Sequence, residues 1–193
     1  MNKVQSSMTT FPKILKRWRP SSSRLFRVEA MEIQFSNGEK REYERLLGSK
    51  PAVITVPMLD DDRFIVVREF AAGTEDYQLA LPKGRVDGQE SFAQAADREL
   101  REEAGFGSRR QILLKQMLQS PNYMEHATQI VLLQDLFEAT AVGDEPEPLG
   151  VEVFRFSALD ELLKRNDFSE ARSIAALFLA REYLSSDANA KTD

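Results

Sequence analysis

The sequence of 193 residues contains no cysteine, which excludes disulfide bonds, zinc–thiolate sites and cysteine nucleophiles. It also has no apolar run near the roughly 18–20 residues that a membrane-spanning helix needs, and no secretory signal opens it. We therefore expect a cytoplasmic protein that works without a membrane partner.

Basic residues are too few to balance the acidic ones: 31 acidic residues face 26 basic residues, and the formal net charge is −5. This balance argues against a nucleic-acid partner, because nucleic-acid-binding domains are usually basic. An acidic protein can still bind phosphates when cations stand between the two sets of negative charge. Any phosphate-bearing ligand of this chain therefore needs a cation as well.

Hydrophobic residues make up 42% and charged residues 30% of the chain, which is typical of one globular domain with a core. The first 28 residues differ, since seven are basic and none is acidic. A transit peptide has a similar composition, and we favour the alternative, a basic flexible arm over residues 1–22. A polar tail is expected over residues 186–193.

A strand followed by a tight turn is expected after the arm. Residues 25–35 alternate between apolar and polar over much of their length. Ser36-Asn37-Gly38 is a strong turn signal, and residues 41–46 offer a returning strand. These features predict an antiparallel β-hairpin region over residues 23–50.

The remaining chain alternates between strand and helix patterns. Asp60-Asp61-Asp62 is expected to form a hairpin turn rather than a metal site, because it lacks the interspersed spacing and the glycine of a calcium loop. Further strands are expected at 52–59, 64–70, 77–81, 111–119, 129–136 and 151–156, and helices at 91–105, 159–165 and 169–183. The mixture predicts an α+β sandwich over residues 51–185, in which helices cover both faces of a mixed sheet.

The helix that begins after Ser91 carries three glutamates on one side. Glu99, Glu102 and Glu103 stand at i, i+3 and i+4, so their carboxylates emerge together and repel one another by roughly 0.2–0.5 kcal/mol per pair. A divalent cation such as Mg²⁺ or Mn²⁺ turns this repulsion into attraction, because both ions prefer oxygen ligands. Taken alone, the pattern also fits an exposed helix with ordinary surface pairs, such as Arg98 with Glu102.

The wider spacing decides between these two interpretations. In order, the chain has Gly84, five residues, Glu90, seven residues, Arg98-Glu99-Leu100, one residue, Glu102-Glu103, one residue and Gly105-Phe106. Seven fixed identities, each at about 5–7% frequency, match by chance at about 10⁻⁸ to 10⁻⁹ of start positions. The stretch resembles the Nudix box, GX5EX7REUXEEXGU with U a bulky apolar residue, at every defined position.

The resemblance extends beyond the box to the Nudix hydrolases of the NudE type, which act on ADP compounds. It rests on Ser23-Arg24-Leu25-Phe26, Phe35-Ser36-Asn37-Gly38, Tyr43-Glu44-Arg45, Gly73-Thr74-Glu75, Gly105-Phe106-Gly107 and Gly143-Asp144-Glu145-Pro146-Glu147-Pro148. It implies an α/β/α Nudix fold and a homodimer formed through the N-terminal sheet region. It also implies metal-dependent cleavage of the pyrophosphate bond of ADP-ribose, NADH or diadenosine polyphosphates, with AMP as a product.

The resemblance also implies roles for the box residues. Glu99 and Glu103 are expected to be the principal metal ligands, and Glu102 a ligand or the general base. The backbone carbonyl of Lys83 is a further expected ligand. Arg98 is expected to hold the glutamates in place.

The resemblance implies roles for residues outside the box only through their positions in the sequence relative to the box. The late acidic loop of such enzymes often supplies the base, and we prefer Glu145 to Glu147 there. Substrate contacts are expected from Tyr43, Glu44 and Arg45, toward the adenosine portion, and from Arg68 and Lys83, toward the phosphates. Each of these five side chains is equally explained as a charge or polar group on a strand surface.

Two other functions fit the same resemblance. One is a non-catalytic Nudix sensor that binds ADP-ribose; such proteins usually lose box glutamates, whereas all of them are present here. The other is hydrolysis of RNA 5′ ends, against which the acidic balance and the absence of an aromatic and basic platform argue. We therefore favour an enzyme with a small nucleotide substrate.

Overall fold

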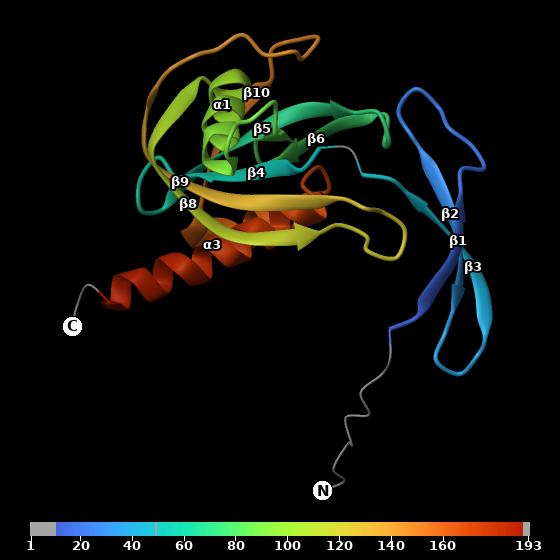
Figure 1. The fold of residues 1–193 in the computed structure, drawn as a ribbon. Helices are drawn as coiled ribbons and strands as arrows, with labels where there is room; N and C mark the ends of the chain where they lie inside the picture. Colours follow the sequence, from blue (N-terminus) through green and yellow to red (C-terminus); the bar gives the residue numbers. More distant parts are fainter. Residues whose placement is uncertain (1–10, 49, 191–193) are drawn as a thin grey trace, which may run out of the picture. The chain divides into compact units, whose positions relative to one another are not determined.

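The structure is a computed structural model that describes residues 11–48 and 50–190. The chain divides into two compact units (Figure 1). One unit contains the chain up to residue 48 together with Ser120–His126. The other contains Lys50–Gln119 and the chain from Ala127 onward.

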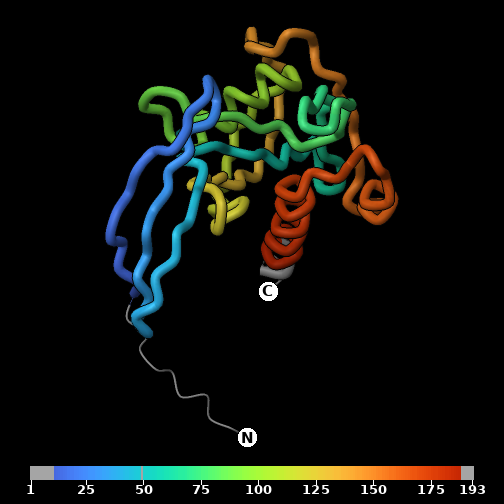
Figure 2. The backbone as a smooth tube through the Cα atoms, turned by 90° about the vertical axis from the view of Figure 1, so that its right-hand side faces the viewer, coloured from blue at the N-terminus to red at the C-terminus, as the bar shows by residue number. Residues whose placement is uncertain are grey.

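The first unit is built on an antiparallel sheet in the order β1-β2-β3, whose strands run side by side in Figure 2. The strands are β1 (Lys13–Trp18), β2 (Val28–Gln34) and β3 (Lys40–Leu46). The predicted hairpin between β2 and β3 is confirmed, since the N–H of Phe35 donates to the carbonyl of Glu39 at 2.8 Å. Gly38 closes the turn with a φ of 86°, a conformation that costs glycine little because it has no Cβ.

Strand β1 lies in the stretch where we expected a basic flexible arm, residues 1–22. That expectation does not hold for residues 13–18, which pair with β2; residues 1–10 lie outside the described residues. Arg17 of β1 donates to the carboxylate of Glu29 at 2.6 Å, and Arg45 of β3 reaches the same carboxylate at 2.9 Å. The strand is exposed from Lys13 to Arg17, so no alternation of buried apolar residues marks it in the sequence.

The second unit is an α/β/α sandwich that contains two sheets. A mixed sheet has the order β7 (Lys83–Arg85), β4 (Ala52–Pro57), β9 (Ala127–Glu138), β8 (Phe106–Leu118), with β4 and β9 parallel. An antiparallel sheet has the order β10 (Gly150–Arg155), β5 (Arg63–Ala71), β6 (Asp76–Ala80). The predicted mixed sheet is confirmed, and the short strand β7 is an addition to the predicted elements.

Helices cover both faces, as predicted: α1 (Phe92–Ala104) lies on one side, and α2 (Leu159–Leu163) and α3 (Ala171–Ala190) lie on the other (Figure 1). Successive residues of a strand point to opposite faces. Accordingly, Leu132 of β9 packs in the cluster that contains Leu177 of α3, whereas Val131 packs in the cluster that contains Leu100 of α1. Helix α3 continues through Ala190, into the stretch expected to be a polar tail (186–193).

Local signals set the ends of the elements around α1. The predicted capping box is confirmed, because the Ser91 hydroxyl accepts from the N–H of Gln94 and the Gln94 side chain accepts from the N–H of Ser91. Before β5, the Asp60 carboxylate accepts from the N–H groups of Asp62 and Arg63, which confirms a hairpin turn there. No helix within the described ranges is long and apolar enough to cross a bilayer.

Candidate active site

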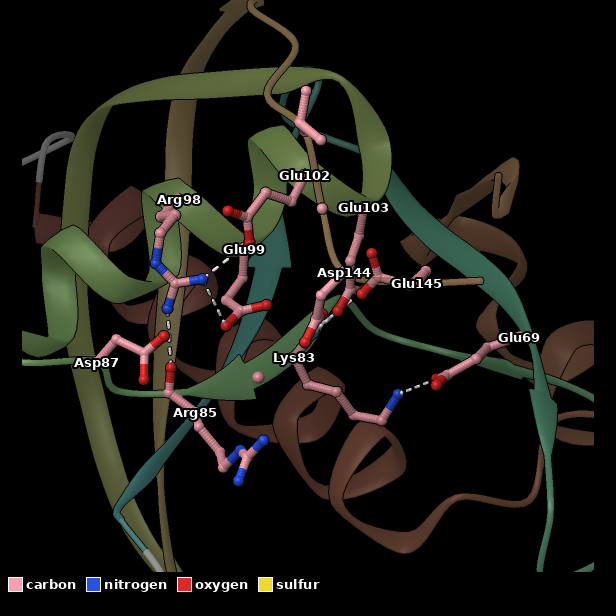
Figure 3. A pocket seen from close by; sticks show the side chains of 13 residues that line it. Glu69, Lys83, Arg85, Asp87, Arg98, Glu99, Glu102, Glu103, Asp144 and Glu145 are labelled. Atoms are coloured by element: carbon pink, nitrogen blue, oxygen red, sulfur yellow. Dashed lines mark hydrogen bonds and ion pairs between the residues drawn. The ribbon is translucent and has the colours of Figure 1, made fainter. Parts of the chain in front are cut away.

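Carboxylates gather in a hollow of about 380 Å³ beside α1 and β7, which we call the carboxylate hollow (Figure 3). Its lining includes seven acidic side chains, Glu69, Asp87, Glu99, Glu102, Glu103, Asp144 and Glu145, and three basic ones, Lys83, Arg85 and Arg98. A pyrophosphate is itself negatively charged, so this excess of acid repels it by Coulomb's law. A cation has to enter with the pyrophosphate to reverse the sign of the interaction.

Two of the carboxylates are buried at the floor of the hollow. Glu99 and Glu103 lie one helical turn apart on α1, on the side that faces β7, and each is only 7% exposed. Burial raises the pKa of Glu99 to about 7 and that of Glu103 to about 8, although the charges of Arg98 and Lys83 act in the opposite direction. Both pKa values are raised because burial removes the carboxylates from water and disfavours their charged form.

Arg98 connects Glu99 and its neighbour Glu102 to the loop that precedes α1. Its Nη1 lies 2.9 Å from Glu99 and 2.8 Å from Glu102. Its Nη2 donates to the carboxylate of Glu90 and to the backbone carbonyl of Arg85, each at 2.8 Å. Arg98 therefore joins the acidic side of α1 to Glu90 and to strand β7.

Strand β7 forms the opposite wall, and Gly84 on it makes room for Glu99. A Cβ at Gly84 would lie 2.0 Å from the carboxyl group of Glu99, far inside any permitted contact. The N–H of Lys83 donates to both oxygens of Glu103 at 3.3 Å. The ammonium of Lys83 pairs with Glu69 at 2.8 Å, at the edge of the hollow.

The acidic loop before β10 supplies the rest of the lining. Glu145 and Asp144 of this loop face the hollow (Figure 3). Glu147 does not line it, and its carboxylate accepts from the hydroxyl of Tyr77 at 2.6 Å. Of the two candidate bases, the structure therefore brings Glu145 to the other carboxylates.

The donor set fits a divalent cation. The oxygens of Glu99, Glu102 and Glu103 are hard ligands of the kind that Mg²⁺ and Mn²⁺ prefer. In the described part of the chain, no three acidic or histidine side chains already converge as a metal cage, and Arg98 lies between Glu99 and Glu102.

The other predicted substrate contacts are not among the residues that line the carboxylate hollow. Tyr43, Glu44 and Arg45 lie on β3 in the first unit. Arg68, on β5, does not line the carboxylate hollow. Its guanidinium donates to Glu152 at 3.0 and 2.9 Å and to Asp167 at 2.9 Å, so its contacts stabilise the antiparallel sheet.

Replacing Asp167 with asparagine is expected to lower the free energy of unfolding at pH 7 by on the order of 1 kcal/mol. Arg165 and Arg68 hold the pKa of Asp167 well below the ordinary 3.8, so the ionised carboxylate stabilises the folded state above that pH. As the pH falls below about 4 toward the folded pKa, this contribution disappears. Denaturant titrations of the wild type and the Asp167→Asn variant from pH 3 to 7 measure the difference in their free energies of unfolding. A difference that does not change with pH contradicts the charge interaction.

Several lining residues were not anticipated. Asp87 lies inside the box stretch and Asp144 inside the acidic loop. Their closeness in sequence to predicted site residues was therefore a weak indication that they line the site. No sequence pattern indicated Glu69 as a site residue, because it is brought to Lys83 only by the pairing of β5 with β6 and of β7 with β4.

Comparisons with known proteins identify the family to which the chain is similar. Residues 12–45 match a model of the NudE-type Nudix hydrolase N-terminal domain, and residues 48–178 match the NUDIX domain. The chain is 44% identical over 174 residues to the ADP compounds hydrolase NudE of Escherichia coli, which covers 90% of this chain and 93% of the relative. It is 24% identical over 152 residues to the ADP-ribose pyrophosphatase of Bacillus subtilis, covering 78% of this chain and 80% of that one. A crystal structure of an ADP compounds hydrolase matches with a TM-score of 0.89 and 43% identity, over 94% of this chain and 98% of that one.

Proposed function

The chain belongs to the Nudix hydrolase family, and from this membership we propose that it hydrolyses the pyrophosphate bond of ADP derivatives and releases AMP. The substrates we propose are ADP-ribose, NADH and diadenosine polyphosphates. One observation carries the proposal: all the box glutamates lie in or beside one acidic hollow, which repels an anion that is not accompanied by cations. The E. coli relative, an ADP compounds hydrolase, supports the choice of substrates.

Nudix hydrolases need a divalent metal, and for this chain we propose Mg²⁺ or Mn²⁺. Glu99, Glu102 and Glu103 would hold it together with the backbone carbonyl of Lys83. When bound, such an ion screens the pyrophosphate charge and makes water a stronger nucleophile.

The side chains of the hollow then have separate tasks. Arg98 keeps Glu99 and Glu102 in place through its contacts with Glu90 and the Arg85 carbonyl. Lys83 offers its ammonium to a phosphate oxygen at the edge of the hollow. A carboxylate, Glu145 or Glu102, accepts a proton from water. The water oxygen forms a bond to one phosphorus while the bond from that phosphorus to the bridging oxygen breaks.

Incubation of the purified protein with ADP-ribose, NADH or diadenosine triphosphate, each with Mg²⁺ or with EDTA, tests the function. We expect AMP from at least one substrate with Mg²⁺ and none with EDTA. Chromatography of the products identifies the bond that breaks and ranks the substrates. If no substrate is hydrolysed while ADP-ribose still binds, the protein is a sensor and the proposed reaction is wrong.

We also propose a cytoplasmic homodimer that forms through the first unit. Strands β1 and β3 are the outer strands of this sheet, and pairing with a partner strand would protect such an edge. In that dimer Tyr43, Glu44 and Arg45 of β3 would contact the adenosine portion of the substrate. Light scattering should give about twice the 22.0 kDa of one chain; a mass of one chain at assay concentration contradicts the dimer.

A further inference from the structure

Lys83 carries a positive charge beside the carboxylates that we expect to hold the metal. Its backbone N–H donates to both oxygens of Glu103 at 3.3 Å, so its main chain already contacts this carboxylate. The ammonium of a lysine sits on a flexible four-carbon stem, which lets it fold back onto a group that its own backbone contacts. An ammonium paired with Glu103 would compete with a metal ion for the same oxygens.

Glu69 holds this ammonium at the edge of the hollow instead. The two charged groups lie 2.8 Å apart, and Figure 3 shows the Lys83 side chain directed to Glu69. The Lys83 side chain is only 19% exposed, so water alone does not satisfy its charge and it needs an acidic partner. Without Glu69, the other acidic side chains of the carboxylate hollow are the partners that remain for it.

Glu103 is the carboxylate of α1 whose oxygens a displaced ammonium would occupy. Arg98 already pairs with Glu99 at 2.9 Å and with Glu102 at 2.8 Å. Within residues 11–48 and 50–190, no lysine or arginine side chain forms an ion pair with Glu103, which accepts from the backbone N–H of Lys83. The apparent affinity of a site falls with the fraction of molecules in which the site is open. Metal binding at Glu103 therefore depends on where the Lys83 ammonium lies.

We propose that Glu69 is a positioning residue that holds the Lys83 ammonium away from Glu103 and so keeps this carboxylate open for the divalent cation. The inference rests on the metal site of the proposed function and adds to it a residue from outside the box. Glu69 acts through Lys83 and does not itself bind the metal. The same ion pair keeps the ammonium at the edge of the hollow, where it can meet a phosphate once the metal is bound.

Mn²⁺ binding without substrate tests the proposal, with free Mn²⁺ measured by electron paramagnetic resonance. The proteins are the wild type, Glu69→Ala, Lys83→Met and the double variant; Lys83→Met keeps the stem and removes the charge. We expect Glu69→Ala to raise the Kd for Mn²⁺ about tenfold, as loss of a residue that supports a metal ligand commonly does. In the Lys83→Met background the same substitution should change the Kd by no more than about twofold, because no ammonium remains to be released.

Two further variants serve as controls. Glu69→Asp keeps a carboxylate that the flexible lysine can follow, so its Kd should stay near that of the wild type. Glu138→Ala removes a glutamate from an exposed strand position that does not line the hollow, and it should bind Mn²⁺ as the wild type does. A Kd that is unchanged in Glu69→Ala overturns the inference. So does an equal rise with and without Lys83, which would mean that Glu69 acts on the metal by its own charge.

Failure of the proposed function is distinguishable from failure of this inference. If the wild type hydrolyses no ADP compound but the effect of Glu69→Ala on Mn²⁺ binding still requires Lys83, the proposed reaction is wrong and the inference stands. If the wild type hydrolyses ADP-ribose while the Kd values are independent of Glu69, the reaction stands and the inference is wrong. A wild type that binds no Mn²⁺ overturns the metal site and the inference together.

Discussion

Replacement of Glu103 by glutamine is expected to lower kcat/KM for ADP-ribose by about a thousandfold at saturating Mg²⁺, or about 4 kcal/mol of transition-state stabilisation. Glutamine keeps the shape of the side chain and still accepts from the N–H of Lys83. It removes one of the two buried negative charges of the carboxylate hollow, where a cation gains more from a charge than it does in water. Initial rates of AMP release, measured over a range of Mg²⁺ concentrations, test the effect.

Stability measurements separate this effect from a damaged fold. The folded pKa of Glu103, about 8, lies above the ordinary 4.5, so ionisation destabilises the metal-free protein progressively as the pH rises from about 4.5 to about 8. In EDTA at pH 8 the Glu103→Gln variant should therefore unfold at the same or a higher temperature than the wild type. Glu138→Gln, at an exposed position outside the hollow, should change neither rate nor stability. Full activity of Glu103→Gln would exclude Glu103 as a metal ligand.

Adding one methyl group at Gly84 is expected to reduce kcat/KM by about a hundredfold, or about 2.7 kcal/mol. The new Cβ would meet the carboxyl group of Glu99 at 2.0 Å. That carboxyl group is the end of a flexible side chain, so it can swing out of the hollow while the backbone of β7 stays paired with β4. The fold should therefore survive while a metal ligand is displaced.

The Gly84→Ala variant is checked by its rate and by its Mg²⁺ requirement. The Mg²⁺ concentration that gives half-maximal activity should rise together with the loss of rate. Gly150→Ala is a suitable control, because the nearest atom to its added Cβ, on Arg68, lies at an ordinary 3.4 Å. Wild-type kinetics for Gly84→Ala would mean that Glu99 acts from another position.

Local patterns in the sequence determined much of the second unit. The capping box at Ser91 and the spacing of Glu99, Glu102 and Glu103 depend only on neighbours within a few residues, because helix geometry relates such positions directly. The buried strands β4 and β9 were visible as apolar runs, since both of their faces pack against helices. The hairpin at Gly38 followed from turn chemistry alone.

Strand β1 and the edge of the site were decided only by tertiary structure. The strand is exposed, so it is stabilised by pairing with β2 and by Arg17 with Glu29 rather than by a pattern of its own. Glu69 contacts Lys83, and Arg68 contacts Glu152 and Asp167, because the fold brings together segments that are far apart in sequence. The sequence specifies the chemistry of each side chain. Which distant side chain each residue contacts depends on the register of strands that pair only in the folded protein.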